Sequence, residues 1–378
     1  MTSTSVARVE IYGYQLTYAH GDYVMSGGRV VNQLDSTVVR VVTEDGTSGF
    51  GETCPLGPTY LPAHSEGARA ALPLLASALV GADVTNAADV QARMEVALQG
   101  SGYAKSALDT ACWDAMGKAT GLSVAQLLGG RLQERLPLYV AVPLGPPAEM
   151  QAFVERQRAL GIHHFQLKVG GRPQEDVTRI AAVLAATGPE DALIADANGG
   201  WQRQDAMIIA RQVERLDSSH RLRLEQPCAT LEESLSVRRS TALPMVLDEV
   251  IVDLPSLMRA VELDAMEHVN LKISRVGGLS RARLIRDAAI DLGLRLTIED
   301  SWGGDIVTAA VSHLAAGVPA DQLFAVSFMN DWTLEHVAGY QPRGEGGWGP
   351  TPAGSGLGIG VDMEMLGDPL WATGTAAR

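Results

Sequence analysis

Residues 192–226 read ALIADANGGWQRQDAMIIARQVERLDSSHRLRLEQ, and this stretch contains the unit that decides the fold. A short apolar run at 192–195 and an alternating run at 221–225 flank residues 203–216, where apolar side chains recur at helical spacing. This order predicts a strand, a helix and a second strand. Two strands joined through a helix lie parallel, and the connection between them is right-handed.

The same alternation continues from residue 138 almost to the end of the chain. The predicted strands are 138–142, 163–169, 192–195, 221–225, 245–248, 268–272, 295–298 and 323–326. The predicted helices between them are 148–160, 174–186, 203–216, 231–239, 255–263, 280–292 and 306–316. Eight parallel strands in succession favour closure into a barrel over an open sheet. We therefore predict an α/β fold, a (β/α)7β TIM-like barrel, over residues 131–349.

Residues 1–130 follow a different pattern. Their apolar spacing predicts strands at 6–16 and 36–42 and helices at 66–80, 90–98 and 103–119. The two strands flank no helix, which is typical of a small antiparallel sheet. We expect an α+β domain over 1–130, completed by the Gly- and Pro-rich tail 350–378.

Composition excludes several classes of partner. Asp and Glu total 44 against 30 Lys and Arg, a formal net charge of −14, which repels nucleic acid and anionic membrane surfaces. No apolar run approaches the roughly 20 residues of a membrane span, and the amino-terminal residues lack a signal-peptide pattern. Cys54, Cys112 and Cys228 show no CxxC spacing, which argues against a disulfide framework or a zinc cluster. We expect a cytoplasmic protein.

Charged residues stand where the predicted strands end. In chain order they are Lys168, Asp196, Glu225, Asp248 and Lys272, at intervals of 28, 29, 23 and 24 residues. Each interval is close to one strand plus one helix, so all five charges reach the same rim. In a parallel barrel this rim is the carboxyl-terminal mouth, where active sites are built. Helix caps or surface ion pairs would explain any one of these residues, but not five in register.

Three of the five are acids. Asp196, Glu225 and Asp248 would repel one another severely if they converged without a cation. Oxygen ligands without His or Cys favour a hard ion, Mg²⁺ before Mn²⁺ or Ca²⁺. We therefore predict Mg²⁺ as the cofactor, with these three residues as its ligands.

The remaining two charges, Lys168 and Lys272, would face each other across the mouth. A nearby metal and partial desolvation disfavour the ammonium form, so one amine can act as a base and the other as its acid partner. The expected partner is a small-molecule carboxylate, because Mg²⁺ on its carboxylate would stabilise the enediolate left when the α proton is removed. Returning a proton to the opposite face gives epimerisation, and loss of a β leaving group gives dehydration. A non-catalytic binding protein of this fold would be expected to lack one of the five charges.

The ordered motifs resemble those of the enolase superfamily, in particular its muconate lactonizing enzyme branch. They are YAKSALDTACWDAMG, LLGG, QLKVGG, DAN, LEQP, LDE, NLKISRVGG and IEDSWGGD. Use of a Lys or His base with Mg²⁺ against an ene-diolate is that superfamily's known chemistry. The resemblance implies that the first domain caps the barrel, that the three acids bind the metal, that the two lysines are the acid/base pair, and that the protein is a homo-oligomer.

The chain departs from the family pattern at one point. The usual Lys-x-Lys is here Gln166-Leu167-Lys168, so only the second lysine is kept, which the resemblance makes the base. After the seventh strand the chain has Glu299-Asp300 and lacks a His-Asp base, which argues against a mandelate racemase or a sugar acid dehydratase.

The runs SGGR, GETCPLGPTYLPAH and IEDSWGGD are similar to those of enzymes acting on proline derivatives. This resemblance implies 2-epimerisation of hydroxyproline betaine or proline betaine first, with dehydration of cis-3-hydroxy-L-proline as the alternative. Tyr60 and Trp302 would offer aromatic faces to a substrate ammonium, while Glu299 or Asp300 would supply an opposing charge or bind a ring hydroxyl. The Gly- and Pro-punctuated segments around residues 23–29 and 51–60 are either plain turns or a lid over the mouth.

Overall fold

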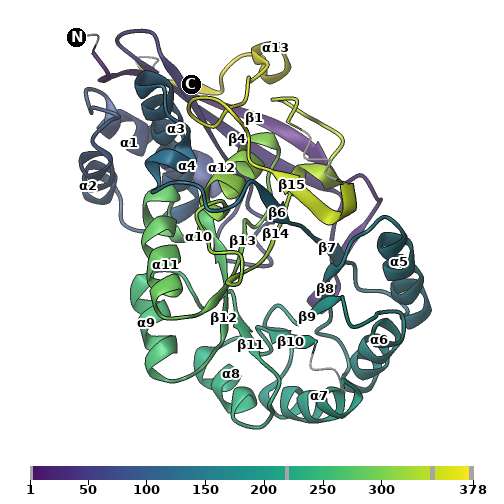
Figure 1. The fold of residues 1–378 in the computed structure, drawn as a ribbon. Helices are drawn as coiled ribbons and strands as arrows, with labels where there is room; N and C mark the ends of the chain where they lie inside the picture. The colour runs from purple at the N-terminus through teal and green to yellow at the C-terminus, as the bar shows by residue number, and fades with distance from the viewer. Residues whose placement is uncertain (1–2, 218–220, 341–344, 374–378) are drawn as a thin grey trace.

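The computed structural model describes residues 3–217, 221–340 and 345–373. Its largest sheet consists of β7 (Tyr139–Val142), β8 (His164–Lys168), β9 (Ala192–Asp196), β10 (Leu222–Glu225), β11 (Met245–Leu247), β12 (His268–Lys272), β13 (Arg295–Glu299) and β14 (Leu323–Val326). Neighbours in the chain pair in parallel, and a parallel bridge between Leu138 and Val326 joins the first strand to the last. This nearly closed ring of eight strands confirms the predicted barrel (Figure 1).

Helices surround the barrel on its outer side (Figure 1). They are α5 (Pro147–Ala159), α6 (Pro173–Ala185), α7 (Arg203–Leu216), α8 (Leu231–Arg238), α9 (Leu254–Glu262), α11 (Leu279–Asp291) and α12 (Asp305–Ala315). Side-chain caps fix some of their starts: Thr230 accepts a hydrogen bond from the backbone N–H of Glu233, and Asp253 accepts one from Ser256. The helix α12 is buried along its whole length, because it packs against the first domain as well as the barrel.

The first domain contains a four-stranded antiparallel sheet. Its strands are β1 (Val6–Thr17), β4 (Gln33–Thr43), β5 (Ser48–Thr53) and β16 (Trp371–Ala372), and its helices are α1 (Ser65–Leu79), α2 (Ala87–Ala97) and α3 (Gly102–Thr120). The tail returns to this domain, since β16 pairs with β1. Residues 374–378 of the expected tail lie outside the described residues. Gly49 and Gly51 let β5 lie against α3, because a Cβ at either position would collide with the helix backbone.

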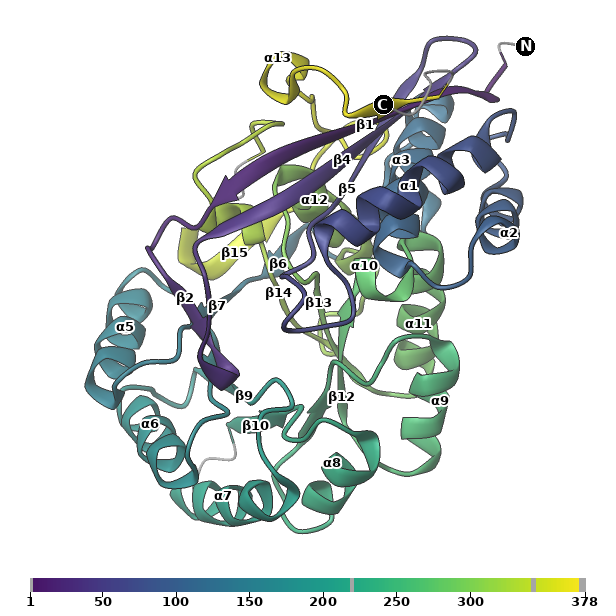
Figure 2. The same cartoon turned by 180° about the vertical axis from the view of Figure 1, so that it is seen from behind.

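A hairpin of β2 (Tyr23–Met25) and β3 (Arg29–Val31) extends from this sheet toward the barrel (Figure 2). It lies close to the loop after β8, where a Cβ on Gly170 would meet the Ser26 side chain. For residues 23–29 the sequence was compatible with either plain turns or a lid. In the structure these residues form a tight turn with a short paired strand on each side. Smaller elements are β6 (Arg135–Pro137), β15 (Trp348–Pro350), α4 (Val124–Leu127), α10 (Ile273–Val276) and α13 (Met363–Leu366).

Within the described part of the chain, no helix combines the length and apolar character that crossing a bilayer requires.

Candidate active site

The predicted charged residues stand at the carboxyl ends of neighbouring barrel strands. Lys168, Asp196, Glu225, Lys272 and Glu299 are the last residues of β8, β9, β10, β12 and β13, and Asp248 directly follows β11. Because all these strands run in the same direction, their ends lie at one rim of the barrel. All six residues are at least nine-tenths buried.

A cavity of about 20 Å³ lies at this rim. Of the predicted site residues, the cavity is lined by Tyr60, Lys168, Lys272, Glu299, Asp300 and Trp302. The three predicted metal ligands lie directly behind this lining, and each accepts a hydrogen bond from a residue in it. The arrangement therefore places all nine predicted residues at one location.

Asp196 faces the first lysine. Lys168 Nζ lies 2.5 Å from Asp196 Oδ2, and the Asn198 backbone and side-chain amides each donate to this carboxylate at 2.8 Å. Burial lowers the pKa of Lys168, but Asp196 and then the neighbouring Tyr23 and Glu225 outweigh it, so the pKa is raised above its usual value. The amine is held as an ammonium in this geometry.

Asp248 faces the second lysine. Lys272 Nζ lies 2.7 Å from Asp248 Oδ2, and the Arg275 guanidinium donates to Oδ1 of the same carboxylate. Burial alone would raise the pKa of Asp248, but the two cations lower it to about 2. This geometry therefore favours the carboxylate form of Asp248.

Glu225 stands between them on β10. Its carboxylate accepts hydrogen bonds from Gln166 Nε2 at 2.8 Å and Asn270 Nδ2 at 2.6 Å, and no lysine among the described residues bonds to it. Burial raises the pKa of Glu225 well above its usual value, and repulsion from Asp196 and Asp248 adds to the shift. The three acids are thus close enough to repel one another, which is the electrostatic condition that a bound cation relieves.

The donor set suits Mg²⁺, because all three groups are carboxylates and no His or Cys joins them. The carboxylate oxygens do not form a tight group, however: Asp196 turns toward Lys168 and Asp248 toward Lys272 and Arg275. Ammonium groups and a metal ion would therefore compete for the same oxygens.

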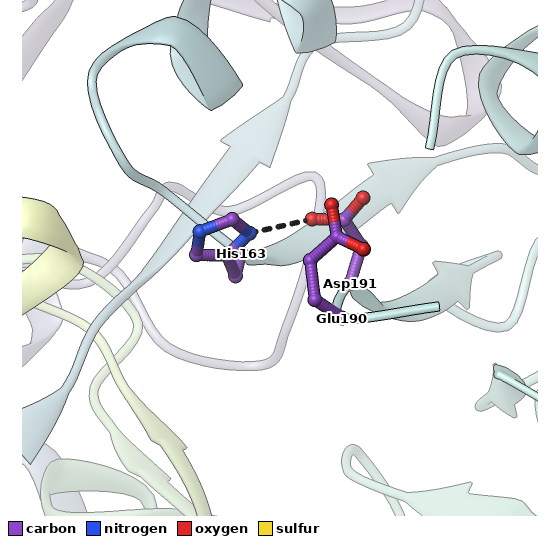
Figure 3. Close-up of side chains that lie close together, drawn as sticks. All are labelled: His163, Glu190 and Asp191. Carbon is purple, nitrogen blue, oxygen red and sulfur yellow. Dashed lines mark hydrogen bonds and ion pairs between the residues drawn. The ribbon is translucent and has the colours of Figure 1, made fainter. Parts of the chain in front are cut away.

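A tighter group lies at the opposite end of the barrel. Among the described residues, His163, Glu190 and Asp191 bring one ligand atom each to within 4.8 Å of one another (Figure 3). They precede β8 and β9, at the amino-terminal rim, and Arg158 already pairs with both acids. This group is remote from the lysines, and its charge is largely balanced by the arginine.

Glu299 and Asp300 differ in their surroundings. Glu299 accepts hydrogen bonds from the Tyr139 hydroxyl and Asn270 and lies 3.2 Å from Lys272 Nζ. Asp300 is held by Ser274 and by the backbone N–H of Ser301, and burial raises its pKa to about 6.

The two predicted aromatic residues also line the cavity. Trp302 packs edge-on against Tyr23, with ring centroids 5.1 Å apart, and its buried indole N–H has no partner among the described residues. Tyr60 donates to Glu249 Oε1 at 2.5 Å, and its ring lies 5.7 Å from Lys272 Nζ.

Some residues of the site were not assigned a role from the sequence. Gln166 and Asn270 hold Glu225, and each stands two positions before a lysine on its strand. Side chains two apart on a strand point to the same face, so this spacing was an available signal. Arg275 has no such signal, because it reaches Asp248 from the single turn α10.

Two family models match the chain. One, described as "Mandelate racemase / muconate lactonizing enzyme, N-terminal domain", covers residues 17–129, and the other, "Enolase C-terminal domain-like", covers residues 149–365. The chain belongs to the mandelate racemase/muconate lactonizing enzyme family of the enolase superfamily. The predicted resemblance is thereby confirmed.

Individual relatives narrow the comparison within this family. The chain is 43% identical to cis-3-hydroxy-L-proline dehydratase of Roseibium aggregatum, over 97% of this chain and 98% of that protein. It is 26% identical to the N-succinyl-L-Arg/Lys racemase of Bacillus cereus, over 82% and 84% of the two chains. A Roseovarius nubinhibens family member, solved in complex with magnesium, superposes with a TM-score of 0.93 at 34% identity, covering 98% of this chain and all of that one. The higher identity to the dehydratase than to the racemase favours the dehydratase alternative over the epimerase that the sequence placed first.

Proposed function

We propose that this enolase superfamily member dehydrates a hydroxylated proline, with cis-3-hydroxy-L-proline as the substrate and Mg²⁺ as the cofactor. The observation that carries the proposal is the 43% identity, over nearly the whole of both chains, to a dehydratase of that substrate. The cavity supports it, because Lys168 and Lys272 line it from opposite sides of the barrel.

The stereochemistry of the substrate suits two opposed amines. In cis-3-hydroxy-L-proline the carboxylate and the hydroxyl share one face of the ring, so the α hydrogen and the hydroxyl lie on opposite faces. In our proposal Lys168 accepts the α proton from one face and Lys272 donates a proton to the departing hydroxyl on the other. The balance is loss of one water and formation of a C2–C3 double bond, after which the cyclic enamine tautomerises to a cyclic imine.

Asp196, Glu225 and Asp248 would hold the metal. Bound there, Mg²⁺ would neutralise the substrate carboxylate and stabilise the negative charge that develops as the α proton leaves. These acids also raise the pKa values of both lysines. If the acids bound the metal instead of the lysines, one amine would lose its proton more easily.

The cavity must open for this reaction. A volume of about 20 Å³ is close to that of one water molecule and is too small for a proline ring. Met25 on the β2–β3 hairpin and Leu56 and Tyr60 in the loop after β5 belong to its lining and to the first domain, so we propose that these segments move to admit substrate.

Epimerisation of a proline-type substrate would use the same two lysines. The relatives that support it, the racemase at 26% identity and an L-Ala-D/L-Glu epimerase of Clostridium acetobutylicum at 27%, are more distant.

Proton NMR in D₂O with Mg²⁺ distinguishes these reactions. We expect cis-3-hydroxy-L-proline to lose water, and L-proline, which has no leaving group, to show at most α-proton exchange. The trans-3-hydroxy isomer, whose α hydrogen and hydroxyl share a face, should eliminate far more slowly. Conversion of proline betaine to its 2-epimer without elimination from the cis-3-hydroxy compound would replace the dehydratase proposal by the epimerase.

A further inference from the structure

A second and larger cavity lies on the other side of Tyr60. Its volume is about 430 Å³, and its lining includes residues 101–104 at the start of α3 together with Glu249 and Arg275 from the barrel rim. Tyr60 lines the catalytic cavity and not this one, whereas Glu249 lines this one and not the catalytic cavity. The hydrogen bond between Tyr60 and Glu249 therefore crosses the wall that separates them.

The start of α3 offers free donors to this cavity. The helix is 19 residues long, and Ser101, at its N-cap position, makes no side-chain hydrogen bond to the first turn. The backbone N–H of Lys105 bonds to Ser101, but the three preceding N–H groups, of residues 102–104, have no partner among the described residues. Unpaired N–H groups at the positive end of a helix favour an anion.

Arg275 provides an independent second feature. Its side chain is 4% exposed, and within the described ranges Nη1 alone is bonded, to Asp248. Nε and Nη2 are buried and have no partner in the described part of the chain. These two nitrogens form the side edge of the guanidinium, the edge that binds a carboxylate through two parallel hydrogen bonds. Leaving such donors unpaired costs free energy that an anion would recover.

Glu249 adds a hydrogen-bond acceptor, and burial, with the nearby Asp248, raises the pKa of its carboxyl to about 7. Its Oε1 accepts from Tyr60 and Asn198, whereas Oε2 is buried without a partner among the described residues. The residues that line the cavity thus include Arg275, with two buried unpaired donors, the start of α3, and Glu249, with a buried unpaired acceptor. A ligand that matches it carries a carboxylate and an ammonium on one small frame.

We propose that this cavity is a second binding site, which takes a small amino- or imino-acid zwitterion with its carboxylate toward Arg275 and α3 and its ammonium toward Glu249. The site is joined to the catalytic residues on both sides. Arg275 binds Asp248, and Glu249 is linked through Tyr60 to Lys272, whose Nζ lies 3.4 Å from the Tyr60 hydroxyl. Occupation of the second site and of the catalytic site should therefore influence each other reciprocally.

Isothermal titration of the full-length, Mg²⁺-loaded protein with L-proline tests the site. Ser101→Asp places a carboxylate at the uncapped end of α3, where it competes with the ligand's own carboxylate. We expect it to weaken one binding event per chain by roughly tenfold or more, the scale of losing charge-assisted hydrogen bonds. Ser101→Gly is the matched control, because Ser101 has a left-handed φ of 56° that glycine adopts readily, and it should bind as the wild type does.

Ala63→Trp, at the rim of the same cavity, blocks it by bulk instead of charge and should remove the same event. This test does not depend on the proposed reaction. It compares the number of L-proline molecules bound by Ser101→Gly and by Ser101→Asp, and any binding in the catalytic cavity is common to both variants. Equal affinity and stoichiometry in all four proteins, or no binding to any of them, would overturn the second site. If the dehydratase proposal is wrong, the NMR assay should instead show cis-3-hydroxy-L-proline unchanged.

Discussion

Lys168 and Lys272 end strands that stand four places apart in a ring of eight, so they approach one cavity from opposite sides of the barrel. Each amine is paired with an acid from a neighbouring strand end, Asp196 or Asp248. A lysine paired with an acid therefore stands on each side of Glu225. Chemistry on both faces of one substrate carbon, or on two adjacent carbons, is what such a site permits.

Metal binding distinguishes the acids at the carboxyl-terminal rim, which include Glu225, from those at the amino-terminal rim, which include Glu190. Glu225→Gln keeps the shape of the side chain but removes one charged oxygen ligand, and should weaken Mg²⁺ by more than the ~10–100-fold that loss of a supporting contact costs. Glu190→Gln, in the group at the amino-terminal rim, is the matched control and should leave both Mg²⁺ affinity and activity unchanged. Calorimetry with Mg²⁺, followed by activity assays after chelation and after re-addition of the metal, measures both. Loss of Mg²⁺ binding in the Glu190 variant alone would place the metal at the amino-terminal rim and contradict the proposed ligands.

Glu52 joins the first domain to the barrel. Its buried carboxylate accepts hydrogen bonds from Tyr14 and Ser36 in the sheet, and from the backbone N–H groups of Gly304 and Val307 at the start of α12. We expect Glu52→Gln to lower the free energy of unfolding by about 1–3 kcal/mol, because an amide nitrogen would replace one acceptor oxygen. Urea denaturation measures the change, with the exposed Glu66→Gln as control. Equal stability of the two variants would show that this contact contributes little.

Asp109 predicts a pH dependence of stability. Burial raises its pKa from 3.8 to about 6, despite hydrogen bonds from Ser280 and Gln91. The folded state therefore holds this proton more tightly than the unfolded state, so the stabilisation is complete below pH 3.8 and is lost as pH rises through 6. At about 1.4 kcal/mol per pKa unit, its upper limit is about 3 kcal/mol.

The comparison of wild type with Asp109→Asn isolates this contribution. The free energy of unfolding of the wild type should fall relative to the variant between about pH 4 and pH 6, whereas the exposed Asp368→Asn should follow the wild type. Denaturant titrations at several pH values measure the difference. A constant difference across this range would contradict the raised pKa.

The barrel could be predicted from the sequence because short apolar or alternating runs, which indicate strands, take turns with longer stretches of helical spacing. The predicted ends of these strands and helices differ from the structure by no more than one residue. The hairpin at Tyr23–Val31 could not, since Ser26, Gly27 and Gly28 read as a plain turn and the pairing on either side spans only three residues. Short strands carry too little periodicity to be distinguished from loops.

The same reasoning explains the limits at the site. The positions of Asp196, Glu225 and Lys272 could be predicted from the sequence, because each lies at a strand end and the strand ends meet at one rim of the barrel. Contacts that depend on a tertiary turn, such as Arg275 with Asp248, or on closure of the ring, such as Tyr139 with Glu299, have no trace in local spacing. The sequence also could not show that the acids pair with lysines, since that depends on side-chain orientation.

The most direct test of the two opposed amines separates their roles. In D₂O with Mg²⁺ and cis-3-hydroxy-L-proline, Lys272→Ala should still exchange the α proton through Lys168 but should eliminate water ~10²–10⁴-fold more slowly. Lys168→Ala should lose both reactions, and Arg172→Ala, which removes a surface cation, should lose neither. Exchange that survives in Lys168→Ala but disappears in Lys272→Ala, or full elimination in either lysine variant, would contradict the assignment.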